Sequence, residues 1–149
     1  MRKREQRLER IRAVHREYHT ALIALGILAR QLQQDPSSLA RHGLKPTDFR
    51  NLQDHLAATY SVRAFAEFES GLRDVWRRTA RDTHPKTVDL VDLLAGRRQV
   101  PGTTLREVHE VREYRNAAVH EDADEADIVE LDELVRRLLQ YFSFMPGDW

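Results

Sequence analysis

Residues 48–76, DFRNLQDHLAATYSVRAFAEFESGLRDVW, carry apolar side chains at intervals of three and four. This spacing gathers them on one face and predicts a long α-helix that begins near Asp48 and runs past Trp76. The apolar stripe consists of Phe49, Leu52, Leu56, Tyr60, Phe65, Phe68, Leu72, Val75 and Trp76. Gly71 lies beside it and costs about 1 kcal/mol relative to alanine in a helix, so a packing reason is expected for it.

Helical spacing extends on both sides of this segment, and nothing alternates like a strand. A first helix is predicted to end at Asp35 and Pro36, because proline cannot continue a helix. Its stripe consists of Leu8, Ile11, Val14, Tyr18, Leu22, Leu25, Ala29 and Leu32. After the central helix, Thr87 is expected to cap a short helix that runs to Leu94 and closes at Gly96, followed by a linker over 97–102.

Two more helices are predicted towards the C-terminal end of the sequence. Thr104 with Glu107 forms a capping-box pattern, so a helix should start there. A last helix is predicted from near Asp127, with Glu130 at the capping-box position. Its expected buried residues are Ile128, Leu131, Leu134, Val135, Leu138 and Phe142, and its expected (i, i+4) pairs are Asp132 with Arg136 and Glu133 with Arg137. The sequence therefore predicts a single all-α domain over residues 1–149, a bundle of about four or five helices.

The composition argues against several classes of protein and of functional site. The 24 basic and 24 acidic residues cancel, so the strongly positive charge typical of duplex-binding proteins is missing. The absence of cysteine rules out disulfides, thiolate metal ligands and a thiol nucleophile, and fits a cytoplasmic protein. The most apolar stretch, residues 21–29, is far shorter than the roughly 20 residues that span a bilayer, so no membrane segment is expected.

The run RNAAVH, residues 115–120, is the strongest pointer to chemistry. On a helical wheel, Arg115 falls in the middle of an apolar arc, where a charged side chain needs a partner. Two interpretations stay open from periodicity alone. Glu67 or Glu69 of the central helix satisfies the guanidinium internally, or the guanidinium faces a cleft where it meets an anion.

His120 follows Arg115 by five residues, which is about 140° around an unbroken helix. The two would meet if the helix ends near residues 118–119, or if two copies of the chain each contribute one. Asn116, His109 and Arg112 share a polar edge with His120. A lone histidine near a helix end is most often a C-terminal cap.

The pattern Arg115, Asn116, three residues and then His120, near a helix end in a small all-α chain, resembles the motif of the HEPN family (higher eukaryotes and prokaryotes nucleotide-binding). The flanking small and apolar residues 117–119 are similar to that family. The stretch 64–69, AFAEFE, resembles the family helix that packs opposite the motif and often bears an acid.

The resemblance implies a HEPN-like fold and a metal-independent endoribonuclease, in many members the toxin of a toxin–antitoxin or defence system, with its site formed across a homodimer. It implies catalytic roles for Arg115, Asn116 and His120, with Glu67, Glu69, His109 and Arg112 as supporting residues. RNA is the expected substrate, 2′,3′-cyclic phosphate and 5′-hydroxyl ends are the expected products, and no cofactor is expected.

Other signals are weaker. Arg97 and Arg98, with Arg73, Arg77 and Arg78, are candidates for contacts to an RNA backbone, although exposed helix charges are the commoner explanation.

His15 and His19 are four apart, but no third metal ligand lies at an obvious spacing, so no metal site is predicted. HEPN members that an antitoxin silences by adenylylation carry a tyrosine two residues after the motif histidine, and this chain has Asp122 there. The difference argues against control by modification at this position. It favours either inhibition by a bound antitoxin protein or the absence of any antitoxin. A non-catalytic HEPN-like module that binds nucleotide, RNA or protein, and an unrelated scaffolding bundle, remain the alternatives.

Overall fold

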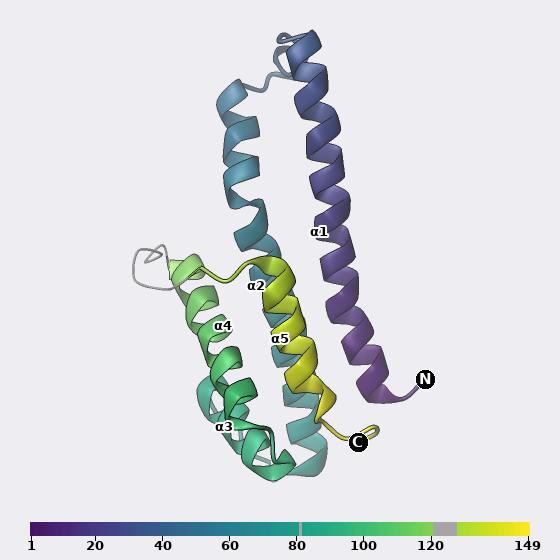
Figure 1. The fold of residues 1–149 in the computed structure, drawn as a ribbon, viewed down its shortest axis with the longest axis vertical. Coiled ribbons are helices and arrows are strands. Elements are labelled where there is room, and N and C mark those ends of the chain that lie inside the picture. The colour runs from purple at the N-terminus through teal and green to yellow at the C-terminus, as the bar shows by residue number, and fades with distance from the viewer. Residues whose placement is uncertain (81, 121–127) are drawn as a thin grey trace.

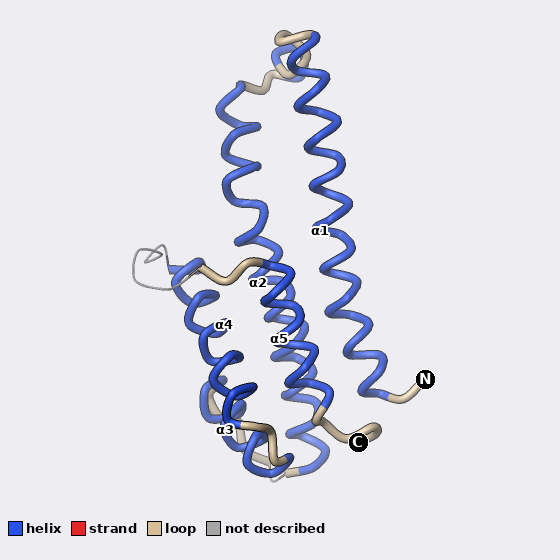
Figure 2. Tube along the Cα trace, in the orientation of Figure 1, coloured by secondary structure: helices blue, strands red, loops and turns tan. Residues whose placement is uncertain are grey.

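The computed structural model describes residues 1–80, 82–120 and 128–149. These residues form five α-helices and one short 3-10 turn, and none of them forms a strand (Figures 1 and 2). The elements in chain order are α1 (Lys3–Gln34), η1 (Ala40–His42), α2 (Pro46–Thr79), α3 (Thr87–Arg98), α4 (Gly102–His120) and α5 (Leu131–Ser143). The predicted all-α bundle is confirmed.

The two longest helices, α1 and α2, run antiparallel and form a long hairpin (Figure 1). α1 ends at Gln34, with Asp35 as its C-cap, as predicted from Asp35 and Pro36. α2 begins slightly earlier than predicted, because Pro46 suits the first turn of a helix. Asp48 then accepts a 2.7 Å hydrogen bond from the backbone N–H of Lys45, which satisfies a free donor at this end.

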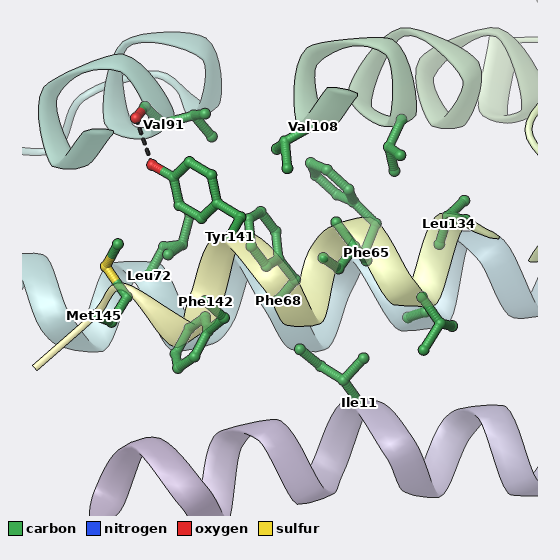
Figure 3. Packing of buried hydrophobic residues seen from close by; sticks show 14 of the residues in the cluster. Ile11, Phe65, Phe68, Leu72, Val91, Val108, Leu134, Tyr141, Phe142 and Met145 are labelled. Atoms are coloured by element: carbon green, nitrogen blue, oxygen red, sulfur yellow. Dashed lines mark hydrogen bonds between the residues drawn. The ribbon is translucent and has the colours of Figure 1, made fainter. Parts of the chain in front are cut away.

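α5 lies against the lower half of the hairpin and contacts α1, α2 and α4, while α3 contacts α2 and α4 (Figure 1). The core forms where these helices meet, around the fully buried Phe65, Phe68 and Tyr141 (Figure 3). Tyr141 donates a 2.6 Å hydrogen bond from its hydroxyl to the backbone oxygen of Val91 in α3. Burial, with the charge of Asp92, raises the pKa of Tyr141, so the phenol stays protonated as a donor.

Gly71 has the packing reason that its place in a helix predicts. A Cβ atom at this position would lie 2.7 and 2.8 Å from the ring atoms Cε2 and Cζ of Phe142. Phe142 is itself fully buried and packs edge-on against Phe68, so the ring has little space to move away. The missing side chain therefore lets α5 approach α2 closely.

Several predicted helix ends are wrong, because the residues expected to cap the helices make contacts with other parts of the fold instead. Thr87 is the first residue of α3 rather than its cap, and its hydroxyl hydrogen-bonds Glu69 at 2.7 Å. The helix passes through Gly96 and Arg97 and ends at Arg98, with Gln99 as its C-cap at a left-handed φ of 53°. Thr104 lies buried in the first turn of α4, which begins at Gly102.

The last helix also begins later than predicted. Asp127 lies outside the described residues, and Glu130 is the N-cap of α5. Ile128 was expected in the core but is 76% exposed, because it precedes the helix. The other five residues expected to be buried in this helix are buried.

Away from α5, the distal half of the hairpin consists of α1, α2 and the connection between them that contains η1 (Figure 1). Leu22, expected on the buried stripe, is 42% exposed there. The apolar side chains of this half are therefore only partly covered by the described residues. No helix among the described residues is long and apolar enough to cross a membrane.

Candidate functional site

The motif residues lie at the C-terminal end of α4, which is continuous from Gly102 to His120. Because the helix does not end at 118 or 119, Arg115 and His120 remain about 140° apart around its axis. Within one chain the two side chains therefore leave α4 on different faces. Of the two routes that would bring them together, only a second copy of the chain remains.

Arg115 is held by residues of α2. Its Nη2 donates a 3.2 Å hydrogen bond to Oε2 of Glu69, and its guanidinium carbon lies 4.6 Å from the centre of the Phe65 ring. Its Nε and Nη1 atoms donate to no residue that the structure describes. The side chain is 22% exposed, so the guanidinium is oriented by α2 while two of its nitrogens donate to none of the described residues.

Glu69 joins three elements through its carboxylate. Besides Arg115, it accepts hydrogen bonds from Nε and Nη2 of Arg73 at 3.1 and 2.7 Å and from the Thr87 hydroxyl at 2.7 Å. Burial alone raises the pKa of Glu69, but the hydrogen bonds from Thr87 and Arg73 and the charges of both arginines outweigh it, so its pKa is lowered. Glu69 is therefore a charged anchor that links α4 to α2 and to the start of α3.

The two acids proposed as partners of Arg115 are not equivalent. Glu69 makes the contact, whereas the carboxylate of Glu67 lies 4.0 Å from Nη1 of Arg7 on α1. Glu67 therefore lies beside α1 and is not the ion-pair partner of Arg115 within one chain, and a supporting role for it in the motif stays a prediction. The internal ion pair of Arg115, one of the two interpretations of the sequence, is present in the structure.

Asn116 and His120 have no such partner among the described residues. Asn116 is half-buried and its side chain makes no hydrogen bond to any described residue. His120 is exposed at the last residue of α4, and it too has no side-chain hydrogen bond within the part of the chain that is described. Neither side chain is therefore engaged by a hydrogen bond to the part of the chain that the structure describes.

His109 and Arg112 form a separate group on α4. Nε2 of His109 lies 2.7 Å from Oδ1 of Asp92 on α3, and Nδ1 of His109 accepts a 3.3 Å hydrogen bond from Nε of Arg112. Because Arg112 can only donate, this network assigns the proton to Nε2 of His109. His109 thus joins α3 to α4 and Arg112 supports it, and among the described residues neither side chain hydrogen-bonds Arg115 or His120.

Arg97 and Arg98 lie at the other end of α4 from the motif. They close α3, four residues before Gly102, and the rise from Gly102 to Arg115 is about 20 Å. The guanidinium of Arg97 stacks on Trp76, 4.5 Å from its ring centre, and Nε of Arg98 is buried. Within one chain they do not extend the motif into a substrate groove.

A basic pocket of about 260 Å³ lies between α1 and α2. The sequence alone did not predict it, because its residues read there only as charged faces of separate helices. The residues lining it are Lys3, Gln6, Arg7, Arg10, Asp74, Arg77, Arg78 and Trp149. Asp74 pairs with Arg7 and with Arg77, while Arg10 and Arg78 make no ion pair with any described residue. The pocket thus combines excess positive charge with an indole ring. Arg77 and Arg78, but not Arg73, belong to it.

A cluster of two histidines and one aspartate joins α1 to α5. His15 and His19 lie beside Asp132, which was expected to pair with Arg136 along its own helix. Arg136 binds Glu133 instead, and the predicted Glu133–Arg137 pair is present at 2.8 Å. Only the three-dimensional arrangement supplies this third side chain to the two histidines, because Asp132 lies more than a hundred residues further along the chain.

Comparison with known proteins gave no match: no family model matches the sequence, and neither a curated protein nor a solved structure is similar enough to this chain to count as a match. The residues 121–127, which include Asp122, lie outside the described part of the chain. A functional assignment therefore depends on the chemistry of the described residues and on the resemblance of the motif.

Proposed function

We propose that this chain is a HEPN-type, metal-independent endoribonuclease that acts as a homodimer, in the manner of a toxin or defence protein of the cytoplasm. The observation that supports the proposal is the state of Arg115. Glu69 and Phe65 fix its guanidinium while Nε and Nη1 remain without a protein acceptor among the described residues, on the same helix end as Asn116 and the exposed His120.

The chemistry needs only these groups, because RNA supplies its own nucleophile. The ribose 2′-oxygen attacks phosphorus as the bond to the 5′-oxygen breaks, which leaves a 2′,3′-cyclic phosphate and a 5′-hydroxyl. Histidine exchanges protons near neutral pH, so His120 takes the proton of the 2′-hydroxyl or gives one to the 5′-oxygen. Arg115 stabilises the added negative charge on the phosphate through its planar fork, and Asn116 orients the phosphate by hydrogen bonding.

The angle between Arg115 and His120 explains why two copies are part of the proposal. A single chain presents them about 140° apart on α4, whereas a two-fold axis near the end of α4 would place Arg115 of one copy beside His120 of the other. Glu69 is then a positioning residue that holds Arg115 towards the shared site. Inhibition by a bound antitoxin protein remains part of the proposal.

The experiment is cleavage of a mixed RNA pool in EDTA by the wild-type chain and by Arg115→Ala, Asn116→Ala and His120→Ala. Wild type is expected to leave cyclic-phosphate ends, and the arginine and histidine variants are expected to be inactive while folded. Arg106→Ala and His55→Ala, exposed residues of α4 and α2, are the matched controls and should retain activity. A folded, dimeric wild type that leaves every RNA intact would exclude this function.

Mixing two inactive variants tests the shared site directly. If Arg115 and His120 act across the interface, a heterodimer of Arg115→Ala and His120→Ala contains one intact site. Random mixing should then restore about one quarter of the wild-type activity, because half of the dimers carry one of two sites. No recovery after verified subunit exchange would contradict a site that pairs the arginine of one chain with the histidine of the other.

One observation favours a second candidate, a non-catalytic module that binds RNA or nucleotide. The basic pocket between α1 and α2 offers Arg10 and Arg78 free of ion pairs within the described chain, next to the Trp149 ring, on which a base can stack. In that case Arg10→Ala with Arg78→Ala should abolish RNA binding measured by fluorescence anisotropy. Arg115→Ala should leave that binding unchanged, and no cleavage should be detected.

A further inference from the structure

Three potential metal-ligand atoms from two helices converge on one point at the surface. His15 and His19 stand one turn apart on α1, and Asp132 lies in the first turn of α5. Nε2 of His15 lies 2.6 Å and Nε2 of His19 lies 3.1 Å from the same oxygen, Oδ1 of Asp132. The two Nε2 atoms are 3.0 Å from each other, so every pair of these atoms is in close contact.

Protons alone cannot satisfy all three contacts. For both imidazoles to bond to the carboxylate, each Nε2 has to carry a hydrogen, since an ionised carboxylate only accepts. Two Nε2–H groups then face each other across 3.0 Å with no acceptor between them. If either Nε2 lacks its hydrogen, the contact of that ring with Asp132 joins two acceptors. One cation between the three atoms satisfies all of them.

From this geometry we propose that His15, His19 and Asp132 bind a divalent transition-metal ion of the zinc class. Zinc binds imidazole nitrogen and carboxylate oxygen at about 2.0–2.1 Å, so ligand atoms around a tetrahedral ion lie about 3.3 Å apart. The present separations of 2.6, 3.0 and 3.1 Å reach that arrangement by opening by about 0.2–0.7 Å. An ion at this bond length sits just outside the plane of the three atoms.

The chemistry of the ligand set selects the metal. Two imidazoles with one carboxylate suit zinc, whereas magnesium and calcium require six or more oxygen ligands. The Asp132 side chain is 71% and the His19 side chain 47% exposed, so the fourth position of the ion opens to water. Three protein ligands with one open position is the coordination that zinc has where it meets exogenous ligands.

The site also has a structural consequence. It joins α1 to the beginning of α5, next to Glu130, the N-cap of that helix. Since the ligands come together only in the folded chain, the ion should bind the native state and raise its stability by mass action. This proposal is independent of the proposed ribonuclease activity, whose assay is run in EDTA and whose proposed site includes none of the three residues.

The test is titration of the metal-free, tag-free full chain with ZnCl₂ by calorimetry, with MgCl₂ in parallel. Wild type is expected to bind one Zn²⁺ per chain and to ignore Mg²⁺. His19→Ala and Asp132→Asn should each lower the Zn²⁺ affinity by at least about 100-fold, since even an outer partner of a metal ligand is worth 10–100-fold. His55→Ala, a single exposed histidine on α2, is the matched control and should bind as wild type does.

A second readout reports the fold directly. At a free Zn²⁺ concentration of about 100 times Kd, the unfolding midpoint of wild type should rise by about 5–10 °C, with no rise for Asp132→Asn. Co²⁺ in place of Zn²⁺ should show the visible absorption of a tetrahedral site in wild type alone. Stoichiometric binding that survives in both ligand variants, or no Zn²⁺ binding by folded wild type, would overturn the proposal, while the ribonuclease assay in EDTA would stand unaffected.

Discussion

The contact between Arg115 and Glu69 can be tested by a double-mutant cycle of Arg115→Ala and Glu69→Ala. The Arg115 Nη2 and the Glu69 Oε2 are 3.2 Å apart, and both side chains are only about one-fifth exposed, 22% and 21%. Exposed ion pairs contribute about 0.2–1 kcal/mol, whereas removing one partner of a fully buried pair costs about 3–5 kcal/mol. This pair lies between those limits, so we expect a coupling energy of about 1–2 kcal/mol.

The two single substitutions differ because Glu69 has more partners. Arg115→Ala loses the ion pair and the stacking on Phe65, about 2 kcal/mol together. Glu69→Ala also leaves Arg73 and Thr87 without their acceptor, so its cost should be somewhat larger, about 2.5 kcal/mol. The double variant should then cost about 3 kcal/mol, clearly less than the sum.

Urea unfolding followed by circular dichroism measures all four corners of this cycle, with comparable m values as the check on two-state behaviour. A double variant whose cost equals the sum of the single costs to within about 0.5 kcal/mol would refute the reasoning, because independent sites add to that precision. A stability of 5 kcal/mol or more, ordinary for a domain, leaves every variant folded. Activity can therefore be measured on the same proteins.

The remaining predictions concern the core and the charge of Glu69. Gly71→Ala should destabilise by about 1 kcal/mol in urea unfolding, because the clash with the Phe142 ring outweighs the gain in helix propensity; a more stable variant would contradict it. Tyr141→Phe should cost about 1–2 kcal/mol in the same assay by removing the hydrogen bond to Val91, and an unchanged midpoint would count against that bond. Since the pKa of Glu69 is lowered, its stabilising contribution is present above the ordinary value of 4.5 and is lost as the pH falls towards the lowered pKa. Glu69→Gln should flatten the acid side of the stability–pH profile measured by thermal unfolding, and a parallel profile would argue that this carboxylate is not paired.

The helices themselves were predictable because their signals are local. The spacing of apolar residues over 48–76 and the stop at Asp35 and Pro36 depend on neighbours within a few residues, and the structure confirms both. A packing reason for Gly71 was predictable, because glycine lowers the stability of a helix unless close packing requires it. The identity of its neighbour, Phe142, was not, since it comes from another helix.

The predicted helix ends were wrong where a side chain could form either a local cap or a tertiary contact. Thr87 and Thr104 both match cap patterns, yet the first hydrogen-bonds Glu69 and the second is buried near Gln140. A cap contributes about 1 kcal/mol, so a tertiary hydrogen bond to a charged group competes with it successfully. Nothing in the local sequence reveals that competition.

The sequence by itself determined that the chain is an all-α bundle and that Arg115 and Asn116 share one helix, but it left open whether that helix reaches His120, which the structure shows it does. The tertiary structure decided what surrounds them: Glu69 rather than Glu67 holds Arg115, and His120 leaves α4 on a different face. It also decided that Asp132 meets the two histidines of α1. The physical reason is that periodicity fixes the angle of a residue about its own helix axis, whereas its neighbours on other helices depend on how all the apolar faces pack together.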